Sequence, residues 1–174
     1  MYSLVQKIKK KERNKRILIL GLDNSGKTTF LHNLLQIPGD IAPTFGFTIQ
    51  TANLFSYQVN FWDLGGQSSI RVFWRNYFEE IVDGIIWVVD STDENRLELA
   101  KHELHAVLKS DLHCPVLIVA NKQDLEEALS GDAVIKMLNL NNLTYRVLEC
   151  SALEDDLSLD SVEWLLNQEV VVPK

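Results

Sequence analysis

The chain is poor in the residues that define several protein classes. It holds two cysteines, four prolines and eight glycines in 174 residues, and no hydrophobic run approaches the roughly 20 residues of a membrane span. Two thiols far apart, Cys114 and Cys150, argue against a disulfide-stabilised secreted fold and favour burial in a reducing compartment. The sequence shows no internal repeat, low-complexity tract or flexible linker. We therefore expect a single soluble, intracellular globular domain.

Positive charge is scarce over most of the sequence and is concentrated at its start. The net formal charge is −7, yet residues 1–16 carry +6, so the remaining residues carry −13. An acidic body repels the phosphate backbone of nucleic acids, which argues against nucleic acid as a partner. The basic segment could contact anionic lipid or an acidic partner. A solvated tail that only aids solubility is the alternative, and both stay open.

Short runs rich in valine and isoleucine alternate with segments of helical periodicity. Four runs predict buried strands: Arg16–Leu20, Gly84–Asp90, Pro115–Asn121 and Tyr145–Cys150. The segments between them predict helices: Lys27–Leu35, Asn95–Lys109, Asp132–Leu138 and Leu159–Gln168. Two further runs, Thr48–Phe55 and Gln58–Trp62, predict an antiparallel hairpin. The expected fold is an α/β domain with a six-stranded, mostly parallel sheet, one antiparallel edge strand and helices on both faces.

A glycine-rich segment follows the first expected strand and leads into the first expected helix. Its sequence, Gly21-Leu22-Asp23-Asn24-Ser25-Gly26-Lys27-Thr28, matches the phosphate-loop pattern G-x-x-x-x-G-K-[ST] in full. The glycines let the backbone curl so that its N–H groups point at phosphate oxygens, and the helix N-terminus adds its dipole. Lys27 would contact the β- and γ-phosphates, and the Thr28 hydroxyl would bind Mg²⁺. The loop, with Thr29 beside it, predicts a P-loop nucleotide-binding domain.

Residues suited to a metal ion and a hydrolytic water follow the second strand of the expected hairpin. Asp63 would hold Mg²⁺ as a Walker-B acid does, and the Gly66 N–H would sense the γ-phosphate. Gln67 has the side chain that orients the attacking water in GTP hydrolysis, which makes it the candidate catalytic residue. Thr44, in the loop before the hairpin, would supply a second hydroxyl to Mg²⁺ when GTP is bound.

The strand Pro115–Asn121 ends in a pattern suited to a purine base, Asn121-Lys122-Gln123-Asp124. The Asp124 carboxylate can accept hydrogen bonds from N1–H and the exocyclic amine of guanine, a pair of donors that adenine lacks. Asn121 would bind the N7 edge, and the stem of Lys122 would cover the ring. After the last strand, the backbone N–H groups of Ser151, Ala152 and Leu153 would contact guanine O6. The pattern therefore favours guanine nucleotides.

These motifs, in this order and spacing, resemble those of Ras-superfamily small GTPases over nearly the whole chain. Gly-Leu-Asp-Asn-x-Gly-Lys-Thr, Pro-Thr-x-Gly-Phe, Trp-Asp-x-Gly-Gly-Gln and Asn-Lys-Gln-Asp resemble the Arf branch. Within it, residues 74–79 and 83–91 are most similar to the ADP-ribosylation-factor-like protein 2 group, followed by the protein 3 group. The resemblance implies a GDP/GTP switch that binds Mg²⁺, hydrolyses GTP slowly unless stimulated, and binds effectors in its GTP state.

The resemblance also implies how the chain is divided and what it contacts. Residues 1–14 would form a basic amphipathic helix that docks on the body in the GDP state, and residues 15–174 would form the G domain. Phe47, Trp62 and Tyr77 match an aromatic triad that contacts effectors, with a purely structural role as the alternative. The implied partners of a monomeric protein are an exchange factor, a GTPase-activating protein and effectors. In the resembled group these effectors are tubulin cofactors or carriers of lipidated proteins.

Two departures from membrane-bound relatives bear on location. Residue 2 is tyrosine rather than glycine and no cysteine follows Cys150, so we expect neither N-myristoylation nor C-terminal prenylation. We expect a cytoplasmic protein, with cytoskeletal association left open and at most weak membrane contact through the N-terminal helix. The alternatives are a membrane-trafficking Arf-type GTPase and a module that reads nucleotide state with negligible hydrolysis. A P-loop nucleotide kinase is disfavoured by the Asn121–Asp124 pattern.

Overall fold

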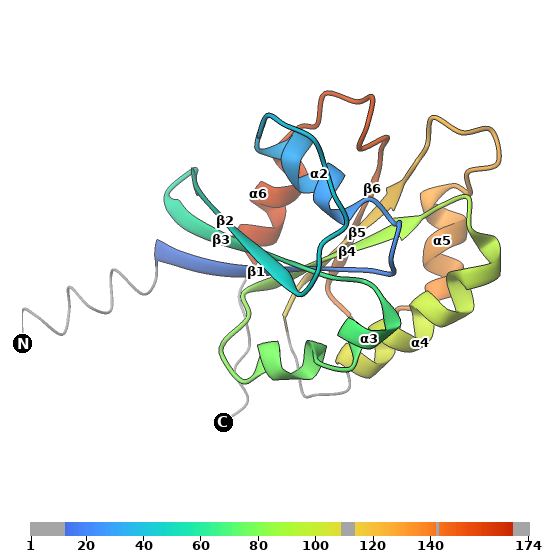
Figure 1. The fold of residues 1–174 in the computed structure, drawn as a ribbon, viewed down its shortest axis with the longest axis horizontal. Helices are drawn as coiled ribbons and strands as arrows, with labels where there is room; N and C mark the ends of the chain where they lie inside the picture. The colour runs from blue at the N-terminus through green and yellow to red at the C-terminus, as the bar shows by residue number, and fades with distance from the viewer. Residues whose placement is uncertain (1–12, 109–113, 142, 169–174) are drawn as a thin grey trace, which may run out of the picture.

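The computed structural model of the protein describes residues 13–108, 114–141 and 143–168, and these form one sheet with helices around it (Figure 1). The sheet has six strands: β1 (Asn14–Leu20), β2 (Phe47–Leu54), β3 (Tyr57–Leu64), β4 (Gly84–Asp90), β5 (Val116–Asn121) and β6 (Tyr145–Glu149). Their order is β2-β3-β1-β4-β5-β6, and only the β2–β3 pair is antiparallel. The expected fold class is therefore confirmed. The helix expected at 1–14 falls almost wholly outside the described residues and stays a prediction.

Helices cover both faces of the sheet. On one face lie α2 (Lys27–Leu34) and α6 (Asp160–Leu166), and on the other lie α4 (Leu97–Leu108) and α5 (Gly131–Leu138) (Figure 1). Two short helical segments, α3 (Ser68–Arg71) and η1 (Trp74–Phe78), follow β3, and η2 (Glu94–Arg96) leads into α4.

The central strand β4 shows why the sheet is sandwiched between helices. Its side chains alternate between two cores, because successive residues of a strand point to opposite faces. Ile85 and Trp87 pack in the core under α4 and α5, and Ile86 and Val88 pack in the core under α2 and α6. A strand buried on both faces reads as a continuous hydrophobic run, which is why β4 spans the residues expected for it.

The described elements differ from expectation in the stretch after β3. Neither α3 nor η1 was expected, since both are short and carry no repeating apolar face. A single fully buried side chain, Trp74, anchors η1 to the core. In addition, β3 runs through Leu64 rather than ending at Trp62, so Asp63 lies within the strand. In this arrangement, the carboxyl ends of β1 and β3 meet the amino end of α2, the edge of an α/β sheet where ligands bind. No helix in the described ranges is both long and apolar enough to cross a membrane.

Candidate functional site

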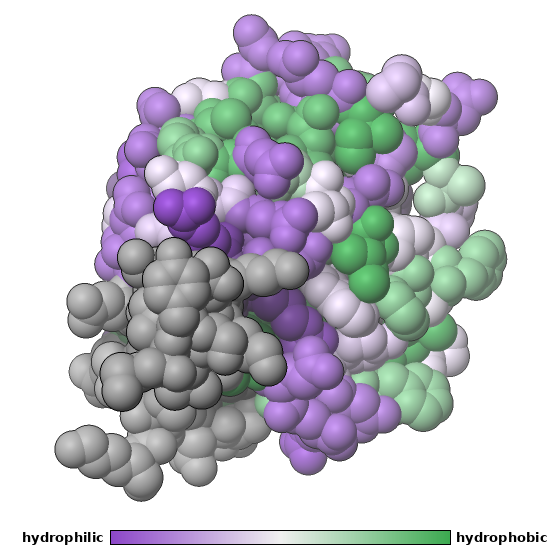
Figure 2. Space-filling model, turned by 90° about the vertical axis from the view of Figure 1, so that its left-hand side faces the viewer, coloured by the Kyte–Doolittle hydropathy of each residue, from purple (hydrophilic) through white to green (hydrophobic). Residues whose placement is uncertain are grey.

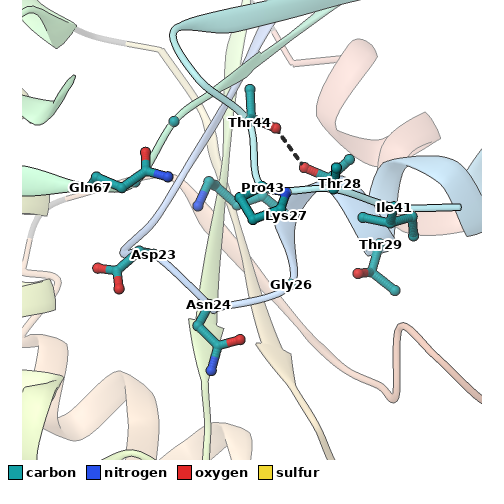
Figure 3. A pocket seen from close by; sticks show the side chains of 13 residues that line it. Asp23, Asn24, Gly26, Lys27, Thr28, Thr29, Ile41, Pro43, Thr44 and Gln67 are labelled. Carbon is teal, nitrogen blue, oxygen red and sulfur yellow. Dashed lines mark hydrogen bonds between the residues drawn. The ribbon is translucent and has the colours of Figure 1, made fainter.

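A cavity of about 410 Å³ opens at the carboxyl ends of β1 and β3 (Figure 3). Three segments far apart in the sequence form its walls: the expected phosphate loop, residues 41–44, and residues 65–67. In Figure 3, Lys27 and Gln67 reach toward each other within it, whereas Asn24 points away. The structure thus brings together the residues assigned from sequence to phosphate, metal and catalysis.

The phosphate loop has the backbone of an anion cradle. Asn24 and Gly26 both adopt left-handed conformations, with φ of 62° and 90°, and Gly26 caps the N-terminus of α2. A Cβ on Gly26 would overlap the Asn121 amide, so glycine is required there on steric grounds as well. A tight curl that ends in a helix N-terminus directs unpaired N–H groups and the positive end of the helix dipole at one point.

Lys27 places a positive charge inside this cradle with little to neutralise it. Its side chain is only 6% exposed, and its Nζ donates a hydrogen bond to the carbonyl oxygen of Leu22 at 2.8 Å. Burial lowers the pKa of Lys27 to about 8, and attraction to Asp63 only partly offsets this. A buried ammonium whose hydrogen-bond partner is neutral favours an anionic ligand.

Three oxygen-bearing side chains meet beside Lys27. The hydroxyl of Thr28 donates to Asp63 Oδ2 at 2.6 Å, and the hydroxyl of Thr44 lies 3.2 Å from the same oxygen and 3.0 Å from Thr28 Oγ1. The second oxygen of Asp63, Oδ1, is buried and has no hydrogen-bond partner among the described residues. Burial raises the pKa of Asp63, and the hydrogen bond from Thr28 opposes that shift.

This oxygen cluster suits a hard divalent cation. Mg²⁺ prefers oxygen ligands and is commonly held by one or two carboxylates or hydroxyls together with substrate phosphates. Asp63 Oδ1 offers an acceptor that nothing else among the described residues uses. The same residues contain no group of three or more His, Cys, Asp or Glu side chains that could hold a metal. A cation bound here would therefore depend on the phosphates of a ligand for its remaining coordination.

The two glycines after β3 lie directly against the phosphate loop. The N–H of Gly65 donates to the carbonyl oxygen of Gly46 at 2.8 Å, which joins this segment to the loop that carries Thr44. At Gly66, an added Cβ would overlap the backbone of Leu22 and Asp23. Gln67 follows and lines the cavity, and its Oε1 is buried without a partner in the described part of the chain.

Asn121 joins two loops of the site, and the base contact assigned to it stays a prediction. Its side chain is buried, with Nδ2 donating to the carbonyl oxygen of Ser25 and Oδ1 accepting from the N–H of Ala152, each at 2.8 Å. It therefore ties the phosphate loop to the loop after β6. Of the three N–H groups assigned to guanine O6, that of Ala152 binds Asn121 and that of Ser151 binds Asp155 at 2.5 Å. Within the described residues, the N–H of Leu153 has no such partner.

The other two residues that this pattern assigns to the base are Lys122 and Asp124, in the loop after β5. Lys122 has a φ of 68°, and its Nζ donates a hydrogen bond to Asp90 Oδ2 at 2.6 Å. The pKa of Asp90 is lowered: burial would raise it, but hydrogen bonds from Lys122 and Thr92 outweigh that effect. Asp124 is exposed and makes no hydrogen bond or ion pair with the described residues.

Comparison with known proteins accounts for this arrangement of motifs. The model of the ADP-ribosylation factor family matches residues 1–169 of the chain. The chain belongs to this family. It is thus a small GTPase of the Arf and Arf-like group, which binds GTP and GDP and hydrolyses GTP.

Curated relatives of this family member are similar over almost their whole length. ADP-ribosylation factor-like protein 2 of Arabidopsis thaliana is 45% identical, with 95% of this chain and 93% of that protein covered. The protein of the same name from Drosophila melanogaster is 44% identical over 94% and 92%. Among solved structures, the Arl6 BBS3 small GTPase from Trypanosoma brucei with bound nucleotide analogue GppNp has a TM-score of 0.78 and 28% identity. That match covers 87% of this chain and 95% of the other.

The aromatic triad of this GTPase is a continuous, partly exposed cluster. Phe47 stacks on Trp62 with ring centroids 5.3 Å apart, and Tyr77 meets both rings edge-on. Phe47 is 46% exposed and the neighbouring Phe45 is 85% exposed. Figure 2 shows the side of the molecule on which the β2–β3 turn lies in Figure 1, where hydrophobic surface alternates with hydrophilic surface. The triad therefore combines internal packing with a face that a partner can contact.

Two residues that contact this site were not singled out from sequence. Trp74 Nε1 donates to the carbonyl oxygen of Gly65 at 3.1 Å, and Arg71 Nη1 donates to that of Gly66 at 2.8 Å. Both belong to segments whose helical character was not expected. A buried tryptophan seven residues after Gln67 is the one sequence signal that could have pointed to them, because a buried indole N–H usually finds a partner.

Proposed function

We propose that this protein is a GDP/GTP switch whose cavity binds the nucleotide phosphates together with Mg²⁺. The observation that carries the proposal is the convergence of Thr28, Thr44 and Asp63, from three separate segments, beside the buried charge of Lys27. Thr28, Thr44 and Asp63 would hold Mg²⁺, which when bound would supply positive charge that offsets the negative charge of the nucleotide phosphates. The phosphates in turn would add to the negative charge of Asp63, which only partly offsets the burial of Lys27.

The chain's own residues would do the remaining work of hydrolysis. Phosphoryl transfer depends mostly on positioning and on charge stabilisation. The N–H groups of the phosphate loop and Lys27 would hold the phosphates, and Gln67 would orient the attacking water. The nearest arginines, Arg71 and Arg96, are held by carboxylates: Arg71 by Glu103 at 3.0 Å, and Arg96 by Asp93 and Asp23. Among the described residues, no arginine lines the cavity, which supports an activating protein that supplies one.

The switch itself would act through the loop that carries Thr44. Contacts of the γ-phosphate with Thr44 and Gly66 would hold the two loops together, and hydrolysis would release them. The present geometry, with Thr44 beside Thr28 and Gly46 bonded to Gly65, is the one expected for the triphosphate state. The likeness to a GppNp-bound small GTPase is consistent with that interpretation.

Guanine selectivity gives the first test of the proposal. Displacement of a fluorescent GDP by unlabelled nucleotides should show GDP and GTP binding at least 100-fold more tightly than ADP or ATP. Asp124→Asn should cost about 100-fold in GDP affinity, since two hydrogen bonds to a carboxylate are lost. It should gain affinity for xanthosine diphosphate, whose second carbonyl can accept from the amide. Glu126→Gln, an exposed acid in the same loop, is the matched control. Equal displacement by ADP and GDP would overturn the proposal.

The partners and location of this GTPase are proposed from its relatives. Similarity to ADP-ribosylation factor-like protein 2 supports effectors of the kind expected from sequence, namely tubulin cofactors or carriers of lipidated proteins. Phe47, Trp62 and Tyr77 would form the contact surface for them in the GTP state. We place this activity in the cytoplasm. A membrane-trafficking role is the second candidate, favoured by the basic charge of residues 1–16.

A further inference from the structure

Two side chains from the segment after Gln67 donate hydrogen bonds to the backbone carbonyl groups of Gly65 and Gly66. The Gly65 carbonyl accepts from Trp74 Nε1 at 3.1 Å, and the Gly66 carbonyl accepts from Arg71 Nη1 at 2.8 Å. These are the last two peptide groups before Gln67. Both contacts reach backward along the chain, and the Gly66 carbonyl accepts a second hydrogen bond, from the backbone N–H of Asp23 in the phosphate loop at 3.2 Å.

The planarity of the peptide group turns these contacts into a directional constraint. In a trans peptide the carbonyl of one residue and the N–H of the next point in opposite directions. The N–H of Gly66 therefore points away from Trp74, and that of Gln67 points away from Arg71. Within the described residues, neither N–H has a hydrogen-bond partner, and both residues line the cavity.

The two holding side chains are themselves fixed. Trp74 is 1% exposed and packs edge-on against Trp87, with ring centroids 5.8 Å apart. Arg71 donates through Nε to Glu103 on α4 at 3.0 Å, and its side chain is 11% exposed. Its Nη1 also lies 3.9 Å from Asp23 in the phosphate loop. Because Trp74 and Arg71 are each held in one orientation, their hydrogen bonds restrict the orientation of the peptide groups that follow Gly65 and Gly66.

We propose that Trp74 and Arg71 are positioning residues that aim the N–H groups of Gly66 and Gln67 at the γ-phosphate. This inference rests on the proposed function, in which the cavity binds guanine nucleotide. GDP has no γ-phosphate, so these N–H groups contribute to the binding of the triphosphate and not to that of the diphosphate. The two side chains therefore set the preference for GTP over GDP without touching either nucleotide.

Trp74→Phe tests the first contact, because it keeps an aromatic ring in the core and removes the indole N–H. The control is Trp164→Phe, since Trp164 lies on α6 and packs against the core on the opposite face of the sheet from Trp74. The same change of ring is thus made at a position that does not contact Trp74 or the site glycines. Affinities for GDP and GppNp are measured with a fluorescent nucleotide, and hydrolysis is measured in a single turnover.

Loss of one neutral hydrogen bond predicts an effect of about five- to tenfold. In Trp74→Phe, GppNp affinity and single-turnover rate should fall by that factor while GDP affinity stays within twofold. Trp164→Phe should change the affinities for GDP and GppNp by the same factor, if at all. Equal losses of GDP and GppNp affinity in Trp74→Phe, or no loss of either, would overturn the inference. Failure of the unaltered protein to bind GDP would instead overturn the proposed function.

Arg71→Lys tests the second contact by keeping the charge while removing the planar fork that spans the Gly66 carbonyl and Glu103. Exposed Arg75→Lys is its control. Arg71→Lys should again lower GppNp affinity by about five- to tenfold and leave GDP affinity within twofold. Glu103→Gln, which loosens the Arg71 side chain at a distance from the nucleotide, should reproduce the same selective loss more weakly. If the ratio of GppNp affinity to GDP affinity is unchanged in both Arg71→Lys and Glu103→Gln, the role proposed for Arg71 is wrong.

Discussion

At the scale of single residues, the site holds two buried charges that balance each other only in part. Lys27 and Asp63 are both buried, and burial shifts the pKa of each toward its neutral form. Hydrogen bonds from Thr28 and Thr44 to one Asp63 oxygen leave the other without a described partner. Such a site is stabilised when an anion and a cation bind together. These buried groups are therefore consistent with the proposed binding of nucleotide phosphates together with Mg²⁺.

Cysteine chemistry gives a prediction at this scale. Burial raises the pKa of Cys114 and of Cys150 to about 12, so only about one thiol in ten thousand is ionised at pH 8. We expect iodoacetamide at pH 8 to leave both cysteines of the folded, GDP-loaded protein unmodified and to alkylate both after denaturation. The mass of the intact protein reports the number of adducts.

The same shift has a consequence for stability. The thiol pKa is higher in the folded protein than in the unfolded chain, so the folded state binds more protons between about pH 9 and 12. The free energy of unfolding should therefore fall across that interval, and fall less in Cys114→Ala. Rapid alkylation of one cysteine at pH 8, while the circular dichroism spectrum stays native, would contradict the buried placement.

At the scale of elements, the sequence pattern predicted best those segments whose own residues determine their structure. The strand β4 and the hairpin β2–β3 were expected because buried runs and alternation are local signals. The phosphate loop was recognised because its spacing is contiguous. By contrast, η1 depends on one buried tryptophan, and the two bridges made by Asn121 depend on loops that lie far apart in sequence. Contacts between segments distant in sequence arise from the packing of the sheet, so no local sequence pattern predicts them.

Arg16 shows how one strand residue joins several elements. It lies on β1, its guanidinium stands 4.5 Å from the ring centroid of Trp62 on β3, and its Nη1 donates to the Tyr77 carbonyl in η1 at 2.7 Å. We expect Arg16→Gln to lower the free energy of unfolding by about 2 kcal/mol, from one hydrogen bond and one partly buried cation–π contact. Urea unfolding at a fixed GDP concentration measures this, because bound ligand adds to apparent stability.

A surface ion pair supplies the comparison for Arg16. Lys101 pairs with Glu98 at 3.5 Å on the exposed side of α4. Exposed pairs of this kind contribute well under 1 kcal/mol, so Lys101→Gln should change the unfolding free energy by less than about 0.5 kcal/mol. If Arg16→Gln behaves like Lys101→Gln, Arg16 does not hold the aromatic triad in place. In that case Phe47, Trp62 and Tyr77 would be organised by their mutual packing alone.

At the scale of the whole molecule, the uneven distribution of charge determines how strongly the protein binds an anionic membrane. Residues 1–16 carry +6 and the remaining residues carry −13. The basic segment is attracted to anionic lipid, by about 1 kcal/mol for each lysine or arginine near the surface, whereas the acidic body is repelled. Both effects reach only about 8 Å at physiological ionic strength. Because repulsion of the acidic body opposes attraction of the basic segment, net binding to the membrane should be weak and reversible.

We expect the GDP-loaded and GppNp-loaded forms both to remain largely in the supernatant when sedimented with anionic vesicles at physiological salt. Lowering the salt should increase pelleting, because screening is reduced and attraction to the basic segment extends further. Reversing three charges in that segment, with Lys9→Glu, Lys10→Glu and Lys11→Glu together, should abolish the increase. Neutral vesicles are the control, since they should pellet neither form at any salt concentration.

The two nucleotide states separate the cytoplasmic proposal from its alternative. If the basic segment is released only in the triphosphate state, GppNp-loaded protein should pellet strongly at physiological salt while GDP-loaded protein stays in solution. That result would favour a membrane-trafficking switch over one whose output is soluble partners. Equal and weak pelleting of the two forms would instead favour a switch whose nucleotide state is detected by soluble effectors that bind the exposed aromatic surface around Phe47.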